Sequence, residues 1–170
     1  MKKLSYLLIF TLGPALFGQG KNPVSTFIRD ALAERSKHMV AAAVEMPGDK
    51  YGFKAPPDLI TFGYLVLHVA DGNYIYCTKI GGVSAPEVPK LSETDPKDKL
   101  VERLKASFDF CTAALAKLDD SNMGETLAIG EIKASRAMTI LTLSSSWATH
   151  YSTEESYLQL NGLPSPSSKK

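Results

Sequence analysis

The chain has 170 residues, with 19 basic and 18 acidic side chains and 44% hydrophobic residues. This length favours one domain with a substantial hydrophobic core, and no internal repeat or glycine-rich phosphate loop suggests a second domain. Because the formal net charge is only +1 and charges of both signs are interspersed, we expect no nucleic-acid partner.

The first 20 residues are typical of a secretory signal peptide. Lys2 and Lys3 precede a mostly apolar run over 4–17, and a short segment rich in glycine follows at 18–20. This run is shorter than the ~20 apolar residues of a spanning helix, so we expect no membrane anchor after cleavage; an uncleaved tethering helix is the alternative. Cleavage after Gly20 leaves 17 basic and 18 acidic residues in an exported protein, either periplasmic or extracellular.

The mature chain begins with a predicted helix from Pro23 to Met46. Proline is favoured in a first helical turn, and Pro47-Gly48 is a typical stop. The loop over 49–60 contains the rigid pair Pro56-Pro57, so we expect no further helix until Thr61 caps one. The inward candidates of the first helix are Phe27, Ala31, Met39, Ala42 and Met46.

Two more helices are predicted in the middle of the chain. The second runs from about Phe62 to Lys79 and ends at Gly81-Gly82. A proline-rich connection over 83–94 is long enough to cross the end of a bundle, and Asp95-Pro96 then caps a third helix that continues to about Leu118. One apolar stripe of this third helix comprises Leu100, Leu104, Phe108, Cys111 and Leu115.

A fourth helix is predicted from near Ser135 to Leu160, after a loop with one extended stretch over 127–132. Four long helices with few alternating segments predict an all-α protein, an antiparallel-type four-helix bundle over 21–162 with long crossover connections. The last residues, 163–170, are rich in proline, serine and lysine, and we expect them to form a loosely held, flexible tail.

His68 and His150 are the residues that most suggest chemistry. If the second and fourth helices pack side by side, the two imidazoles meet in the bundle interior, and imidazole is a common ligand of zinc, nickel and iron. A third ligand is expected one helical turn before His150, where the residue is Ser146. The alternative for each histidine is a hydrogen-bonded core residue, whereas His38 is expected at the surface or in an interface.

Three strings of residues, in this order, resemble the DinB-like family of bacterial four-helix proteins. They are Tyr51-Gly52-Phe53-Lys54 followed by Pro56 and Thr61-Phe62-Gly63; Leu67-His68-Val69-Ala70-Asp71-Gly72-Asn73-Tyr74; and Trp147-Ala148-Thr149-His150-Tyr151 leading to Tyr157-Leu158-Gln159-Leu160-Asn161-Gly162-Leu163-Pro164. The resemblance covers about 23–168. It implies a metal bound by one histidine of the second helix and an H-x-x-x-H pair of the fourth.

Residue by residue, His68 and His150 match two of the family's ligands, and Ser146 stands at the position of the third. A serine hydroxyl is a much weaker ligand for a transition metal than imidazole, so the resemblance implies a degenerate divalent-metal site. Glu154 is one turn beyond His150 and is a candidate oxygen ligand in the same cavity, with a solvated charged face as the alternative. Asp71 is a candidate to orient His68, with a place on the polar surface as the alternative.

Two functions follow from these residues. The first is a metal-dependent hydrolase or thiol transferase-like enzyme, of the kinds found among relatives, in which zinc, nickel or iron polarises a substrate or activates water. No general base can be named. The second is a non-catalytic exported bundle that binds a small molecule or a protein partner, and a homodimer is compatible with either function. Asn73 and Tyr74 are further candidates to line the cavity, and a core position with a satisfied hydroxyl is the alternative for Tyr74.

The two cysteines, Cys77 and Cys111, lie on apolar faces of the second and third helices. An even number of cysteines in an exported protein favours a disulfide, and two buried free thiols are the alternative. Neither cysteine has a neighbouring base or a helix N-terminus to lower its pKa, so we do not expect a catalytic thiol.

Overall fold

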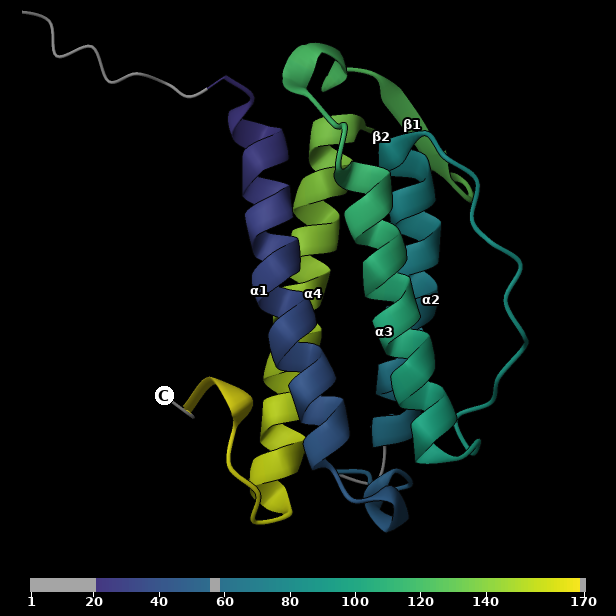
Figure 1. Cartoon of the computed structure of the whole chain (residues 1–170), viewed down its shortest axis with the longest axis vertical. Helices are drawn as coiled ribbons and strands as arrows, with labels where there is room; N and C mark the ends of the chain where they lie inside the picture. The colour runs from purple at the N-terminus through teal and green to yellow at the C-terminus, as the bar shows by residue number, and fades with distance from the viewer. Residues whose placement is uncertain (1–20, 56–58, 169–170) are drawn as a thin grey trace, which may run out of the picture.

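The computed structural model describes residues 21–55 and 59–168, so the predicted signal peptide, the Pro56-Pro57 pair and the last two residues lie outside the described part. Four long helices make up the fold (Figure 1): α1 (Pro23–Glu45), α2 (Phe62–Gly81), α3 (Lys97–Leu115) and α4 (Arg136–Leu160). The all-α class and the order of the helices are confirmed, and the predicted ends differ by a few residues.

Local side chains explain most of the helix ends. The Thr61 Oγ1 accepts a hydrogen bond of 3.0 Å from the Tyr64 N–H and starts α2, as predicted. Gly82 ends this helix in the left-handed region, at φ 65°. The expected cap at Asp95 is wrong, because its carboxylate accepts a hydrogen bond from the Ser92 N–H instead and α3 begins after Pro96.

A distant carboxylate caps α1. Asn22 makes no side-chain cap, and the Asp120 carboxylate accepts hydrogen bonds of 2.8 and 2.9 Å from the Val24 and Ser25 N–H groups. Asp120 belongs to the short helix η2 (Asp120–Asn122), almost 100 residues away in the sequence. A negative charge at a helix N-terminus also complements the helix dipole.

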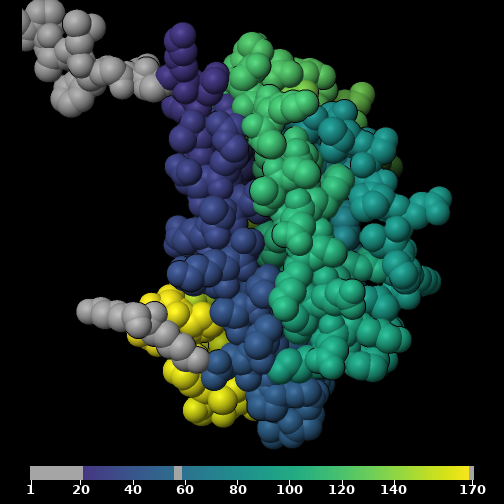
Figure 2. All heavy atoms as spheres, in the orientation of Figure 1, coloured from purple at the N-terminus to yellow at the C-terminus, as the bar shows by residue number. Residues whose placement is uncertain are grey.

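The helices form a ring in which α1 and α2 each contact both α3 and α4. Contacts between α2 and α3 keep a constant sequence separation, 34 residues for both Asn73 with Ser107 and Cys77 with Cys111, so these helices are parallel. The connection over 82–96 returns along the side of the bundle (Figure 1) and projects from one flank in the space-filling view (Figure 2). The expected long crossover connection is therefore present, but it runs along the side of the bundle instead of across its end, and the parallel pair α2 and α3 departs from the antiparallel type.

Chain length explains this difference. An extended chain covers about 3.3 Å per residue, whereas a helix rises only about 1.5 Å per residue. The connection can therefore return along the whole of the 20-residue helix α2. A connection that returns in this way starts the next helix at the same end, which makes the two helices parallel.

The core lies between the four helices. The predicted stripe of α3 is confirmed, since all five of its residues are buried. On α1, Met39, Ala42 and Met46 are buried as expected, but Phe27 is 46% exposed. The adjacent Ile28 is fully buried in its place, so Phe27 lies beside the buried stripe.

A β-hairpin joins α3 to α4. Its strands β1 (Thr126–Ile129) and β2 (Ile132–Ser135) are antiparallel, and Gly130 adopts φ 59° in the turn. The expected extended stretch is confirmed in β1, and it is half of a hairpin that the sequence pattern did not predict. The hairpin contacts α2 and α4.

The described part of the C-terminal segment is docked, in contrast to the flexible tail that was expected. Residues 163–168 end in the short helix η3 (Pro166–Ser168), which contacts α1. The Glu155 carboxylate of α4 accepts hydrogen bonds from the Ser165 and Ser167 hydroxyls, and the Ser167 N–H donates to the Tyr151 hydroxyl.

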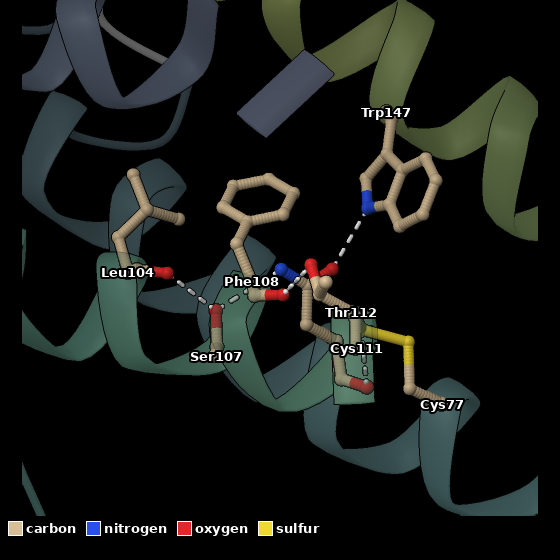
Figure 3. Close-up of a disulfide and its surroundings, with 8 residues drawn as sticks. Cys77, Leu104, Ser107, Phe108, Cys111, Thr112 and Trp147 are labelled. Atoms are coloured by element: carbon tan, nitrogen blue, oxygen red, sulfur yellow. Dashed lines mark hydrogen bonds between the residues drawn. A yellow bond between two sulfur atoms is a disulfide. The ribbon is translucent and has the colours of Figure 1, made fainter. Parts of the chain in front are cut away.

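The buried Cys77 and Cys111 form a disulfide between α2 and α3 (Figure 3). The structure therefore contains the expected disulfide and not two free thiols. Within the described residues, none of the helices combines the length and the apolar character needed to cross a membrane.

Candidate functional site

His68 of α2 and His150 of α4 meet at the seam between these two helices. Their ring centroids are 5.1 Å apart and the ring planes are inclined by 45°. Two hydrogen bonds hold α2 and its N-terminal end against α4: Trp147 Nε1 donates to Asn73 Oδ1, and the Tyr157 hydroxyl donates to the Ile60 carbonyl. The expected meeting of the two imidazoles is therefore present, although His68 is exposed and His150 half-buried instead of both lying in the interior.

The two histidines line a cavity of about 270 Å³. Ser146 and Asn73 also line it, so three of the predicted site residues, the two histidines and Ser146, share one space. None of the residues that line the cavity is acidic or basic apart from the histidines. The remaining lining residues are Val69, Gly72, Ile75, Tyr76, Ile129, Leu143 and Trp147.

His150 is set up as a neutral imidazole. Burial lowers its pKa below the ordinary range, and the nearby His68 lowers it further. Its Nε2 is buried and has no hydrogen-bond partner among the described residues. Since buried polar atoms nearly always have a partner, this nitrogen is a candidate donor for a bound group.

A chain of hydrogen bonds runs from Trp147 to Leu104 (Figure 3), and two of its members, Trp147 and Asn73, line the cavity. Trp147 Nε1 donates to Asn73 Oδ1 at 2.7 Å, and Asn73 Nδ2 donates to Ser107 Oγ at 3.0 Å. The Ser107 hydroxyl in turn donates to the Leu104 carbonyl at 2.7 Å. Because each of these buried polar groups is paired, Trp147 is held in one position beside the histidines.

Some of the expected neighbours of the histidines are elsewhere. Asn73 lines the cavity as predicted, but the Asp71 carboxylate accepts a hydrogen bond from Arg103. Tyr74 packs against Phe110, away from the cavity.

Tyr64 is a neighbour of the site that the sequence reasoning missed. Its ring stacks on His68, with the centroids 5.7 Å apart and the planes inclined by 11°. The signal that could have found it is an aromatic residue four positions before His68 on the same helix, since such residues lie on one face.

Glu154 is neither in the histidine cavity nor on a solvated face, the two positions that were expected for it. It is fully buried, which rules out a solvated face, and it is not among the residues that line the histidine cavity. A step of four residues turns a helix by about 40° beyond a full turn, and this rotation carries Glu154 from the seam into the core. Both carboxyl oxygens lack a hydrogen-bond partner among the described residues, and burial, then the charge of Glu155, raises its pKa well above the usual range.

His38 was expected at the surface or in an interface, and the structure places it in the interface between α1 and α4. Its ring stacks on Tyr151 between α1 and α4, with centroids 5.4 Å apart. It lies outside the cavity of the other two histidines.

The donor set fits a divalent ion only in part. In the described ranges 21–55 and 59–168, no group of three or more histidine, cysteine or acidic side chains is placed to hold a metal. Two imidazoles suit zinc, nickel or iron, whereas the third donor, at Ser146, is a neutral hydroxyl. This set fits weak binding with open coordination positions.

Fold and cavity together define a four-helix bundle with a histidine pair between two of its helices. The sequence profile of the DinB superfamily matches residues 31–151, and the chain belongs to this superfamily. The resemblance to the DinB-like family is thereby confirmed.

Solved structures support the same fold. A DinB-like protein from Bacillus subtilis is 14% identical, with a TM-score of 0.66, and the match covers 80% of this chain and 92% of that one. A DinB-like protein from Bacillus cereus is 10% identical, with a TM-score of 0.67 and coverages of 82% and 93%. A conserved protein from Enterococcus faecalis is 11% identical, with a TM-score of 0.65 and coverages of 81% and 96%. No curated protein matches the chain.

Proposed function

We propose that this DinB superfamily protein is exported and binds a divalent transition-metal ion weakly between His68 and His150, with Ser146 as a poor third donor. The observation that carries the proposal is the pair of imidazoles 5.1 Å apart, one with a buried and unpartnered Nε2. The Cys77–Cys111 disulfide supports the export part of the proposal, because disulfides persist mainly in oxidising compartments.

The chemistry that fits this site is hydrolysis or group transfer. A bound divalent ion supplies a Lewis acid that polarises a substrate. The imidazoles of His68 and His150 hold the ion, and apolar side chains such as Leu143 and Ile129 form part of the cavity wall. No aspartate, glutamate or lysine lines the cavity to act as a general base.

A non-catalytic role is the second candidate. The lack of an acidic residue in the cavity lining and the serine at the third position favour a bundle that binds a small molecule without transforming it. A role in binding a protein partner, or a homodimer, is also compatible with this scaffold. Metal content separates the candidates only in part, so the first experiment addresses the ion itself.

The first prediction concerns Ser146→His. The variant places a third imidazole one helical turn before His150, so we expect zinc affinity to rise at least about tenfold, because even outer-shell partners contribute 10–100-fold. Competition with a chromophoric chelator measures the affinity. Purification without chelators should give substoichiometric metal in the natural chain.

Two controls make this test specific. Ser145→His adds the same side chain at an exposed neighbouring position of α4 that does not line the cavity, and it should leave zinc affinity unchanged. His38→Ala removes the histidine outside the cavity and should also have no effect, whereas His150→Ala should abolish binding. Equal affinities for the two serine variants would show that the proposed ligand geometry is wrong.

A further inference from the structure

A second cavity adjoins the histidine cavity. It has a volume of about 70 Å³ and lies beneath the β-hairpin, between Leu127 and Ala134 of the strands and Thr139 and Thr142 of α4. The two cavities share Tyr76 and Ile129 as lining residues. These two side chains therefore lie at the boundary where the cavities adjoin.

The imidazole and amide groups of this space lie at one end. The histidine end contains the two imidazoles, Ser146 and Asn73, whereas the far end has two threonines, and Tyr76 lines both cavities. The hydroxyls of Thr139 and Thr142 donate to the carbonyls four residues earlier, those of Ser135 at the end of β2 and Met138 in α4. The far end therefore offers a ligand mainly methyl and aliphatic surface, which suits an apolar chain.

Charge decides what kind of head group suits the histidine end. Imidazole ligands carry no negative charge, so they do not compensate the 2+ charge of a bound ion, and no acidic side chain lines either cavity. A charge in an apolar site is costly unless an opposite charge accompanies it. A ligand with an anionic donor would supply that charge and also fill an open coordination position.

We propose that the two cavities together hold an unbranched apolar chain that ends in one anionic donor group. The donor lies at His68 and His150, and the chain passes between Tyr76 and Ile129 to the space beneath the hairpin. The head-group part of this inference depends on the metal binding proposed above, whereas the chain part depends only on the shape and lining of the cavities.

Straight-chain carboxylates test the inference. Butanoate, hexanoate and octanoate are titrated into zinc-loaded protein, with 1-octanol as the neutral comparison. The single Trp147 lines the histidine cavity and reports binding by its fluorescence, and calorimetry gives the affinity. We expect about a fourfold gain in affinity per added methylene and tighter binding of octanoate than of 1-octanol.

Ala134→Phe fills the far cavity and should remove the dependence on chain length, while zinc affinity stays unchanged. The matched control is Ala128→Phe in the other strand, because Ala128 is exposed and lines neither cavity. Circular dichroism checks that both variants fold. Thr142→Met, at an exposed position of α4 that lines the far cavity, provides a second blocking variant.

Each outcome has one meaning. Equal affinities for butanoate and octanoate, or equal effects of the Ala134 and Ala128 variants, would overturn the chain part. Equal affinities for octanoate and 1-octanol would overturn the head-group part. If chelator competition shows that the protein binds no zinc, the proposed function and the head-group part fail, and octanoate binding to metal-free protein then decides the chain part alone.

Discussion

Glu154 is the residue whose position departs most from what its chemistry suggests. A fully buried carboxyl group without a hydrogen-bond partner is costly when ionised, and burial raises its pKa well above the usual range. Between the unfolded pKa, about 4.3, and this raised value, the folded protein binds more protons than the unfolded chain. The free energy of unfolding contributed by Glu154 therefore falls as the pH rises through this window.

Glu154→Gln should remove this pH dependence. We expect the metal-free variant to be more stable than the natural protein at about pH 8 and to lose this advantage towards about pH 4. The reason is that the buried carboxyl group must stay protonated at a pH where the unfolded chain ionises it, whereas an amide does not ionise. Urea unfolding at several pH values, followed by Trp147 fluorescence, measures the effect. An unchanged slope of stability against pH between 5 and 8 would contradict the prediction.

Glu155→Gln provides the matched control. Burial alone would raise the pKa of Glu155, but hydrogen bonds from Ser165 and Ser167 more than offset it and lower the pKa. Its contribution to stability is therefore present above the unfolded pKa and is lost as the pH falls. This variant should be less stable near neutral pH and should keep the decline between pH 5 and 8 that Glu154 causes.

At the scale of single elements, α2 depends on a close approach to α3. A Cβ built at Gly81 would lie 2.5 Å from the carbonyl oxygen of Ala114, whereas one at Gly72 of the same helix meets nothing within 4 Å. The two helices can therefore pack closely at Gly81 only because it has no side chain.

Gly81→Ala should destabilise the protein by about 1–3 kcal/mol, since backbone atoms of α3 must move away. Gly72→Ala should be neutral or stabilise it by about 0.5–1 kcal/mol through helix propensity. Urea unfolding compares the two. Equal effects of both substitutions would mean that the helices do not approach each other as described.

Individual elements could be predicted unevenly. The stripe from Leu100 to Leu115 was predictable because its period is a property of neighbouring residues alone. The cap of α1 was not, since its donor groups at Val24 and Ser25 are satisfied by Asp120 from a distant loop. The second strand, Ile132–Ser135, was also not predicted, because it is short and lacks a strong alternating pattern.

At the scale of the whole molecule, the disulfide joins two parallel helices across the long connection. Cys77 and Cys111 are 34 residues apart, and the bond closes a loop that contains the whole segment 82–96. Such a bond restricts the unfolded chain more than the folded one.

Replacing both cysteines by alanine should lower the free energy of unfolding by about 3–4 kcal/mol, according to the loop-entropy relation. Urea unfolding measures the loss. Mass spectrometry of the natural protein should give a denatured mass that rises by two hydrogen atoms on reduction, and identical masses would show that the bond is not formed.

The candidate site could be predicted in composition and only partly in position. His68, His150 and Ser146 were identified from the sequence, and the structure places all three in one cavity. Two features of the cavity could not be predicted. The exclusion of Glu154 depends on how α4 is rotated after packing, and the contribution of Ile129 depends on where the hairpin lies.

The amino-acid sequence by itself determined the helix spans, the buried stripe of α3, the superfamily and the histidines, because periodicity, caps and motifs are properties of short segments. Only the tertiary structure decided that α2 and α3 are parallel, that Glu154 is buried in the core, and that the hairpin places a second cavity next to the histidine pair. These features depend on the balance of contacts between segments far apart in the chain, and no local pattern records that balance.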